Sequence, residues 1–528
     1  MPSKTIAIIG GGIAGLAAGC YAQMNGYRTT IFELHDLPGG LCTAWERKGF
    51  TFDGCIHYLY GSGPGQPFHQ LWQELGVAQA QPFIDHDEFL RVVGPDGRTF
   101  GVYCDPQRLA EHMKTLSPAD APLIDALAQG IRQFTRFDMS RWAATPRSLM
   151  GPAEGLAIAK AMAPFVCPLL RWGNVSAQEF GARFKDPFLR RAVPLMFNWP
   201  EIPMMAGLAQ LAYMHTGNAG FPASGSLAFA QAIERRYRAL GGDIRYLAQV
   251  EQILVKHHRA AGVRLYNDDV YESDYVISAA DGHKTIFGML NGAYATRALR
   301  RRYDGRLPVH TMVQVSLGIT RDFSAEPHWM TYLLDEPVLI AGASQPALGV
   351  KHYCFDPSLA PPGQSALEVM LPSPYHYWQR IYGRRLYKSE QEQVADQVLS
   401  VLEQRYPGIA AQVEVVDVAT PLSYERYTGN WHGSTCGWLL TKQTMGLMLR
   451  GVSKTLPRLA NFFMAGQWVE PGGSVPLAAM SGRNAVQLIC RQDGRPFVTE
   501  KADVMTVSAV KPLDSGIVAG RSRERKEI

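Results

Sequence analysis

A chain of 528 residues, 46% hydrophobic and 19% charged, has the composition of a globular protein and is long enough for two to four domains. Its formal net charge of +5 is small for this length, and no recognition module accompanies the basic residues, which argues against a nucleic-acid-binding protein. The eight cysteines are scattered without a CxxC pair, so we expect no metal site and no disulfide framework, and a reducing, cytoplasmic location.

The first predicted element is a buried strand that runs through a glycine turn into a helix, in the stretch TIAIIGGGIAGLAAG. Gly10, Gly12 and Gly15 match the G-x-G-x-x-G pattern of dinucleotide sites. The first glycine permits a tight turn, the second lets the backbone approach a pyrophosphate, and the third lets the helix pack closely on the strand. The start of the helix, which includes Ala14, then offers free N–H groups to phosphate oxygens.

The next predicted elements extend this nucleotide site. Glu33 ends the second predicted strand, where its carboxylate is placed to accept hydrogen bonds from both ribose hydroxyls and disfavours NADP. NAD and FAD both satisfy the pattern up to this point. Gly39 and Gly40 then form a second small-residue turn, which suits the longer FAD molecule, although an ordinary surface turn has the same composition.

An apolar stretch at 155–172, GLAIAKAMAPFVCPLLRW, is interrupted by Lys160, Pro164 and Pro168, so it does not read as a membrane-spanning helix. We expect it to be buried or to line a ligand channel. The alternative is an apolar patch at a membrane interface.

Further along, residues 220–290 contain a glycine turn, an amphipathic helix and three short apolar or alternating runs, which predict a strand meander. Beyond 300, the stretches HTMVQVSLGIT and QSALEVMLP predict strands of a separate sheet, and SEQEQVADQVLSVLEQRY predicts a helix. The stretch NFFMAGQWVEPGGSVPLAAM predicts a strand, a glycine loop and a helix that can direct its positive end at a flavin. Together with the second glycine turn, this loop makes FAD the favoured cofactor, with contacts from Gly466, Gly473, Val475 and Pro476.

The predicted fold class is α/β, a discontinuous Rossmann-like FAD-binding domain with an inserted α+β substrate domain. Three pieces of the chain build the FAD-binding domain and two pieces between them build the substrate domain, followed by a loose tail. The predicted boundaries are 1–75, 216–300 and 451–498 for the FAD-binding domain, 76–215 (helical) and 301–450 (mixed sheet) for the substrate domain, and 499–528 for the tail.

These stretches, with FDGCIHYLYG near the N-terminus, resemble the phytoene desaturase-type flavoproteins, including the carotenoid isomerase and retinol saturase branch, within the amine oxidase-like superfamily. The resemblance covers about a third of the chain and implies an extended FAD, with Val250 presenting backbone groups to the adenine. Many members carry a basic residue directly after the second glycine pair. Leu41 stands there in this chain, so the charge is missing or comes from elsewhere, with Arg483 as one candidate.

The resemblance also places His57 and Tyr58 near the flavin, and we take them as the first candidates for catalysis. The alternative for His57 is a core histidine bonded to a backbone carbonyl. Glu425 is a second candidate, with a structural ion pair as its alternative.

The predicted function is the dehydrogenation, saturation or isomerisation of a hydrophobic isoprenoid or polyene by hydride transfer with flavin N5. One rival is an amine or amino-acid oxidase that releases hydrogen peroxide, and another is a non-catalytic flavoprotein that escorts a prenyl lipid. The expected partners are a hydrophobic small molecule and, transiently, a membrane surface, while the oligomeric state stays open.

Overall fold

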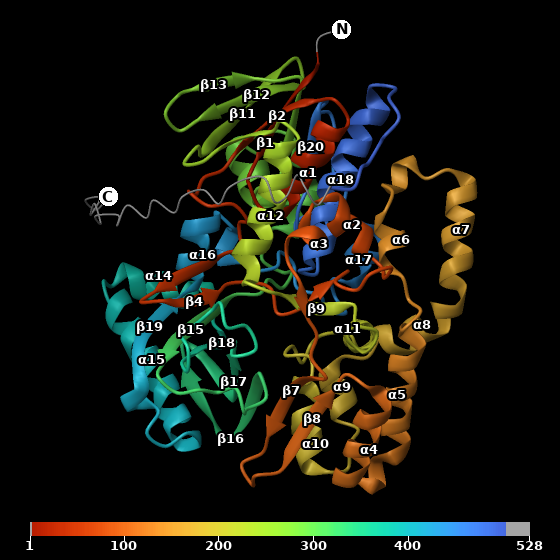
Figure 1. Cartoon of the computed structure of the whole chain (residues 1–528). Helices are drawn as coiled ribbons and strands as arrows, with labels where there is room; N and C mark the ends of the chain where they lie inside the picture. Colours follow the sequence, from red (N-terminus) through yellow and green to blue (C-terminus); the bar gives the residue numbers. More distant parts are fainter. Residues whose placement is uncertain (1–2, 503–528) are drawn as a thin grey trace.

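A five-stranded parallel sheet lies in the upper part of the molecule in Figure 1, in a computed structural model that describes residues 3–502. Its strand order is β10-β2-β1-β14-β20, and every neighbouring pair is parallel. The strands come from all three pieces of the predicted FAD-binding domain, so the α/β, discontinuous Rossmann-like fold class is confirmed. They are β1 (Thr5–Ile9), β2 (Arg28–Phe32), β10 (Asp243–Arg245), β14 (Tyr275–Ser278) and β20 (Phe462–Met464).

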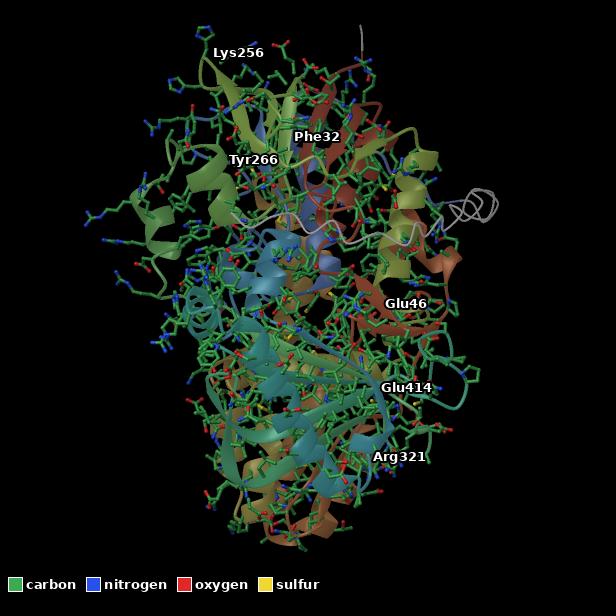
Figure 2. The ribbon with its side chains drawn as sticks, turned by 90° about the vertical axis from the view of Figure 1, so that its left-hand side faces the viewer. Phe32, Glu46, Lys256, Tyr266, Arg321 and Glu414 are labelled. Carbon is green, nitrogen blue, oxygen red and sulfur yellow. The ribbon has the colours of Figure 1, made fainter. Side chains whose placement is uncertain are left out.

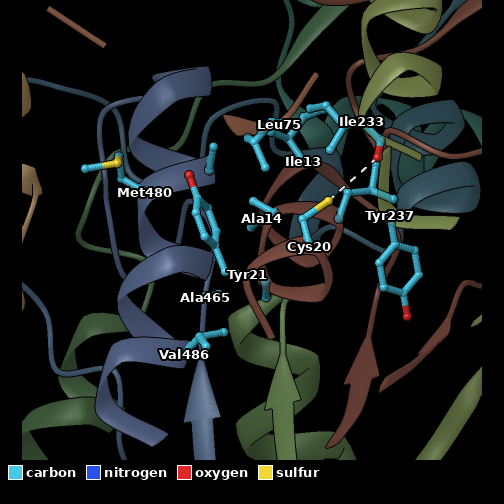
Figure 3. Packing of buried hydrophobic residues seen from close by; sticks show 14 of the residues in the cluster. Ile13, Ala14, Cys20, Tyr21, Leu75, Ile233, Tyr237, Ala465, Met480 and Val486 are labelled. Carbon is cyan, nitrogen blue, oxygen red and sulfur yellow. Dashed lines mark hydrogen bonds between the residues drawn. The ribbon is translucent and has the colours of Figure 1, made fainter. Parts of the chain in front are cut away.

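Three helices, α1 (Ile13–Met24), α12 (Gly225–Ala239) and α18 (Val475–Gln492), pack together beside this sheet (Figure 3). Most of α1 is buried, which explains why its sequence is apolar on every side. Small residues let α1 and α18 approach closely, because a Cβ atom on Gly482 would lie 2.2 Å from the carbonyl oxygen of Ala14.

A three-stranded antiparallel sheet lies between β10 and β14 in the chain. It is built from β11 (Val250–Lys256), β12 (Arg259–Leu265) and β13 (Val270–Glu272). Figure 2 shows Lys256 at its outer end, with Tyr266 closer to Phe32 of β2. The predicted meander is therefore right for two of its three runs. The third, DYVISAA, became β14 of the parallel sheet, where all four of its strand residues are buried.

The two inserted segments share one seven-stranded sheet, with the order β19-β15-β18-β17-β16-β7-β8. All neighbouring strands are antiparallel except β7 and β16. The helix α15 (Tyr387–Arg405) packs on this sheet through buried residues that recur at helical spacing. The strands are β7 (Glu88–Val93), β8 (Thr99–Tyr103), β15 (Met312–Ile319), β16 (Trp329–Ile340), β17 (Ala343–His352), β18 (Ser365–Pro372) and β19 (Val413–Ala419).

Helices of the first inserted segment surround β8 and the end of the sheet, and short strands connect this region to the parallel sheet (Figure 1). The helices are α4 (Pro106–Leu116), α5 (Ala121–Phe134), α6 (Met139–Ala143), α7 (Pro152–Met162), α8 (Val166–Gly173), α9 (Ala177–Gly181), α10 (Pro187–Ala192) and α11 (Met204–His215). The short strands are β3 (Ala44–Arg47), β4 (Phe50–Asp53), β5 (Leu59–Tyr60), β6 (Phe83–Ile84) and β9 (Ala219–Pro222). Smaller helices complete the chain: α2 (His69–Glu74), α3 (Val77–Ala80), α13 (Arg297–Arg302), α14 (Tyr375–Gly383), α16 (Pro421–Thr428) and α17 (Met445–Arg450).

The apolar stretch at 155–172 is not buried, so this half of its prediction is wrong. Three of its residues, Met162, Val166 and Leu169, line a large cavity, which agrees with the other half. Residues 152–173 form the helical run α7–α8, which is long and apolar enough to cross a membrane, yet only 6% of its most apolar window is buried. The side chains of Leu156 and Leu170 are 71% and 65% exposed. The run stands at one side of the molecule, and only its inner face contacts the remaining helices (Figure 1). Of the predicted tail, residues 503–528 lie outside the described residues.

Candidate active site

The glycine turn between β1 and α1 has the geometry that its sequence predicts. Gly10 adopts a φ of +96°, a conformation that favours glycine, and its N–H donates to the carbonyl of Phe32 at 2.8 Å. A Cβ atom on Gly15 would lie 1.9 Å from the carbonyl oxygen of Gly10, so only glycine lets the helix pack this closely on the strand. Gly12 caps α1 without a side chain, which leaves the first N–H groups of the helix available to an anion, with Ala14 in the first turn.

The carboxylate of Glu33 lies directly behind this turn. Its Oε2 accepts a hydrogen bond from Gly11 N at 2.5 Å, and its Oε1 accepts one from His35 N at 2.9 Å. Burial raises the pKa of the Glu33 carboxyl, and the backbone N–H donors oppose this shift. The structure therefore places Glu33 at the turn, and its contact with ribose stays a prediction.

The second glycine turn lies against the first. Gly39 N donates to Gly11 O at 2.9 Å, and Gly12 and Gly39 form a parallel bridge. Gly39 has a φ of +109°, and a Cβ there would lie 2.1 Å from the carbonyl oxygen of Cys42. A Cβ on Gly40 would meet the Cα of Gly12 at 3.3 Å. Two stretches of backbone without side chains thus meet where an extended dinucleotide would cross the end of the sheet.

The C-terminal loop adds a third contribution. Gly466 follows β20, and its N–H donates to Ser481 Oγ at 2.6 Å. Gly473, Val475 and Pro476 line a large cavity at the start of α18. Ser474, the N-cap of α18, has a buried hydroxyl without a hydrogen-bond partner among the described residues. The start of this helix thus combines a positive dipole end with an unsatisfied polar group that faces the cavity.

Two cavities lie near the glycine turns. The smaller one, of about 230 Å³, is lined by Gly10 and Val250 together with residues of β2 and of the segment after β14. The larger one, of about 920 Å³, is lined by Leu41 and the start of α18. An elongated dinucleotide that followed the glycine turns would have one end at the small cavity and the other at the large one.

The walls of the large cavity are mostly apolar. Aromatic and methionine side chains contribute to them, including Trp142, Trp199, Met205 and Met312. Its volume is at the upper end of the range for small-molecule sites, about 300–1,000 Å³. Met162, Val166 and Leu169 from the α7–α8 run also line it, so the cavity extends from the glycine loop to this exposed apolar run.

His57 and Tyr58 both line the large cavity, just before β5. His57 Nδ1 lies 3.1 Å from Lys351 Nζ, so its partner is a lysine and not the backbone carbonyl considered above. Burial lowers the pKa of His57 well below its usual value, and the charges of Lys351 and His310 add to this shift. Burial raises the pKa of Tyr58 to about 12. Both side chains are therefore neutral at neutral pH.

The catalytic role predicted for Glu425 does not fit its position. It lies on α16 and lines neither cavity, and its Oε2 accepts a hydrogen bond from Tyr375 OH at 2.6 Å. Arg483 is equally unsuited to replace the charge missing at Leu41. It lies in the third turn of α18, donates to Ala144 O at 2.7 Å and packs on the Tyr21 ring.

Sequence reasoning missed three polar residues, one in the cavity wall and two behind it. His310 lines it and shares a 2.7 Å hydrogen bond with Thr435 Oγ1, and Lys351 contacts His57 from behind. Asp53 is buried next to them. Lys351 belongs to no motif. Asp53 stands in FDGCIHYLYG and His310 begins HTMVQVSLGIT, but no spacing in these stretches assigns the two side chains to a site. The sulfur atoms of Cys42 and Cys55 lie 3.2 Å apart beside this region.

Comparison with known proteins identifies the family. The model of the family described as flavin containing amine oxidoreductase matches residues 13–490. The chain belongs to this family. The resemblance to phytoene desaturase-type flavoproteins is also confirmed by relatives. A chloroplastic prolycopene isomerase of Daucus carota is 24% identical over 501 residues, covering 90% of this chain and 78% of that protein. A phytoene desaturase (lycopene-forming) of Pseudescherichia vulneris is 24% identical over 514 residues, covering 92% and 99%.

Solved structures show the same fold. A triple mutant of putrescine oxidase aligns with a TM-score of 0.60 at 16% identity, covering 93% of this chain and 99% of that one. An oxidoreductase from Methanosarcina mazei aligns with a TM-score of 0.58 at 17% identity, covering 92% and 100%. As a member of the flavin-containing amine oxidoreductases, the protein is an oxidoreductase with FAD as its cofactor.

The residues at the glycine turns fit FAD. The side-chain-free backbone of both turns, the uncapped start of α1 and the unpartnered Ser474 hydroxyl are features that a bound dinucleotide would satisfy. Within residues 3–502, no group of three histidine, cysteine or acidic side chains is arranged to hold a metal ion.

Proposed function

We propose that this flavoprotein desaturates, saturates or isomerises a hydrophobic polyene of the isoprenoid class that it takes up from a membrane surface. One observation carries the proposal: a mostly apolar cavity of about 920 Å³ connects the FAD-binding loop with an exposed apolar helix. When bound, FAD supplies hydride transfer at N5. The chain itself holds the substrate against that position, excludes water from the cavity and exchanges a proton through His57.

The chemistry of the walls favours a polyene over an amine. Glu470 is the one carboxylate among the described residues that line the large cavity, and it forms an ion pair with Lys454. A cationic amine would therefore enter a mostly apolar space without an unpaired carboxylate to bind it. A polyene needs only apolar and aromatic contacts, which Trp142, Trp199 and the methionines provide. The relatives named as carotenoid desaturases and isomerases support the same substrate class.

The test uses the purified yellow protein under anaerobic conditions. Vesicles that carry acyclic or cyclic polyenes of different saturation are mixed with it, and the flavin absorbance and the mass and geometry of the polyene are followed. We expect a polyene to change in saturation or double-bond geometry. Two results would overturn the proposal: oxygen-dependent peroxide formation with a soluble amine, and polyene binding without any change in the polyene, as an escort protein would show.

The membrane contact has a matched pair of variants. Leu170 on α8 and Leu339 on β16 are 65% and 67% exposed, but only Leu170 belongs to the apolar run beside the cavity. We expect Leu170→Glu to weaken binding to vesicles and Leu339→Glu to leave it unchanged. Equal vesicle binding by both variants would place the membrane contact elsewhere.

A further inference from the structure

A lysine is buried behind the large cavity with a single hydrogen-bond partner among the described residues. Lys351 lies near the end of β17 and is only 1% exposed. Its neighbours across the sheet are Trp329 on β16 and Glu368 on β18. Its Nζ atom points out of the sheet toward the segment after β4, where it lies 3.1 Å from His57 Nδ1. A buried ammonium group with one partner is costly, so its position calls for an explanation.

The nearby carboxylates do not form an ion pair with this lysine. Asp53 uses its oxygens to accept hydrogen bonds from Ser226 N, Ser226 Oγ and Cys55 N, at 2.6, 2.7 and 3.0 Å. Glu368 accepts a hydrogen bond from Tyr353 OH at 2.7 Å.

Aromatic rings occupy the rest of the surroundings, with the ring centres of Tyr353, Phe221 and Trp329 at 4.4, 5.2 and 5.6 Å from Lys351 Nζ. His57 is therefore the hydrogen-bond acceptor of Lys351 within the described part of the chain.

This contact decides which ring nitrogen of His57 carries the proton. An ammonium group has only donors, so Nδ1 must accept and the ring proton is on Nε2. The ring lines the large cavity and meets the Trp329 ring in an edge-on contact, with 5.0 Å between ring centres. We propose that Lys351 is a positioning residue that sets the tautomer of His57 and exchanges a proton with it, so that His57 Nε2 exchanges protons with the substrate. The second half of this inference rests on the proposed function.

The proton balance closes in both directions. In saturation, Nε2 gives its proton to a substrate carbon while Nδ1 takes one from Lys351, which becomes a neutral amine. In isomerisation, the same transfer is followed by its reverse, so the proton leaves the substrate carbon again and Lys351 ends as an ammonium group. In desaturation, Nε2 takes the proton from the substrate carbon, and Nδ1 returns its own to the neutral amine. His57 stays neutral before and after each transfer, and the electron pair moves only with the hydride or within the polyene.

The surroundings suit this exchange. Burial lowers the pKa of Lys351 to about 8, and the charges of Glu368 and Asp53 oppose the shift. A lysine in this range can lose and regain a proton near neutral pH. The titratable groups that interact with the pair come from several elements: Asp53, His86, His310, His328, His352, Tyr353 and Glu368.

The first test needs no substrate. Nitrogen NMR of the FAD-loaded protein with ¹⁵N-labelled histidine rings, compared with His57→Gln for assignment, reports which nitrogen of His57 is protonated. We expect a bare Nδ1 in the wild type and a proton shared between both nitrogens in Lys351→Met. Lys256→Met, a variant of an exposed lysine on β11, should resemble the wild type. An unchanged His57 tautomer in Lys351→Met would overturn the positioning role.

The second test separates positioning from proton exchange. In Lys351→Gln an amide N–H can still donate to Nδ1 but cannot release a proton, so we expect the wild-type tautomer with polyene turnover slowed about 100-fold or more. We also expect the pH dependence near pH 8 to disappear from the rate. A wild-type rate and pH profile in this variant would overturn the exchange. If the proposed function is wrong, the wild type itself will not turn over polyenes, while the NMR result stands.

Discussion

Replacement of Gly15 by alanine tests the packing of the glycine turn. The added Cβ would lie 1.9 Å from the carbonyl oxygen of Gly10, whereas ordinary contact begins at 3.4 Å. The overlap of about 1.5 Å involves backbone on both sides, so no side-chain rotation relieves it. Alanine gains about 1 kcal/mol over glycine in helix propensity, but overpacking of this severity costs about 3 kcal/mol. We expect a net loss of about 2 kcal/mol in the free energy of unfolding.

To relieve this overlap, the N-terminus of α1 must shift away from the place of the bound phosphate. Loss of one hydrogen bond to a charged group, about 1.5–3 kcal/mol, weakens FAD binding about ten- to a hundredfold. The matched control is Gly155→Ala in α7, where a Cβ would have no neighbour within 4 Å and only the helix-propensity gain remains. Urea unfolding and FAD retention after gel filtration measure both effects. Equal stability and equal FAD content in the two variants would refute the steric reasoning.

Three further predictions concern the cavity and its entrance. Burial lowers the pKa of His310 to about 4, so the folded protein disfavours the protonated ring. The free energy of unfolding that depends on the neutral ring is fully present above pH 6.5, and at most about 3 kcal/mol of it is lost as the pH falls to 4. Urea midpoints at pH 7 and 5 should therefore differ less in His310→Gln than in the wild type. Ala209→Trp should fill part of the large cavity, so we expect an unchanged flavin spectrum and no polyene turnover. A retained turnover rate would place the substrate elsewhere. The exposed Cys167 on α8 should react with iodoacetamide before the other cysteines and be protected by vesicles, and unchanged labelling with vesicles would argue against the membrane contact.

Much of the nucleotide-binding part could be predicted because its signals are local. Gly10, Gly12 and Gly15 follow a strand and open a helix within one short stretch, so spacing alone indicates the turn. The strand, loop and helix around Gly466 are also contiguous.

The rest depends on contacts between distant residues. Lys351 and His57 are 294 positions apart, and no local pattern connects them. The apolar composition of 152–173 fits a buried helix as well as an exposed one, and only the tertiary structure shows that few elements cover it. Strands β7 and β8 were missed because they join the sheet only through the pairing of β7 with β16, which comes from the second inserted segment.

The central claim is that one elongated FAD extends from the small cavity at Val250 to the large cavity at His57. A crystal structure of the yellow protein with bound FAD tests it most directly. We expect the adenine beside Val250, the pyrophosphate over the paired glycine turns, and the flavin ring at the start of α18 with the apolar space in front of it. A flavin ring outside the large cavity would contradict the account.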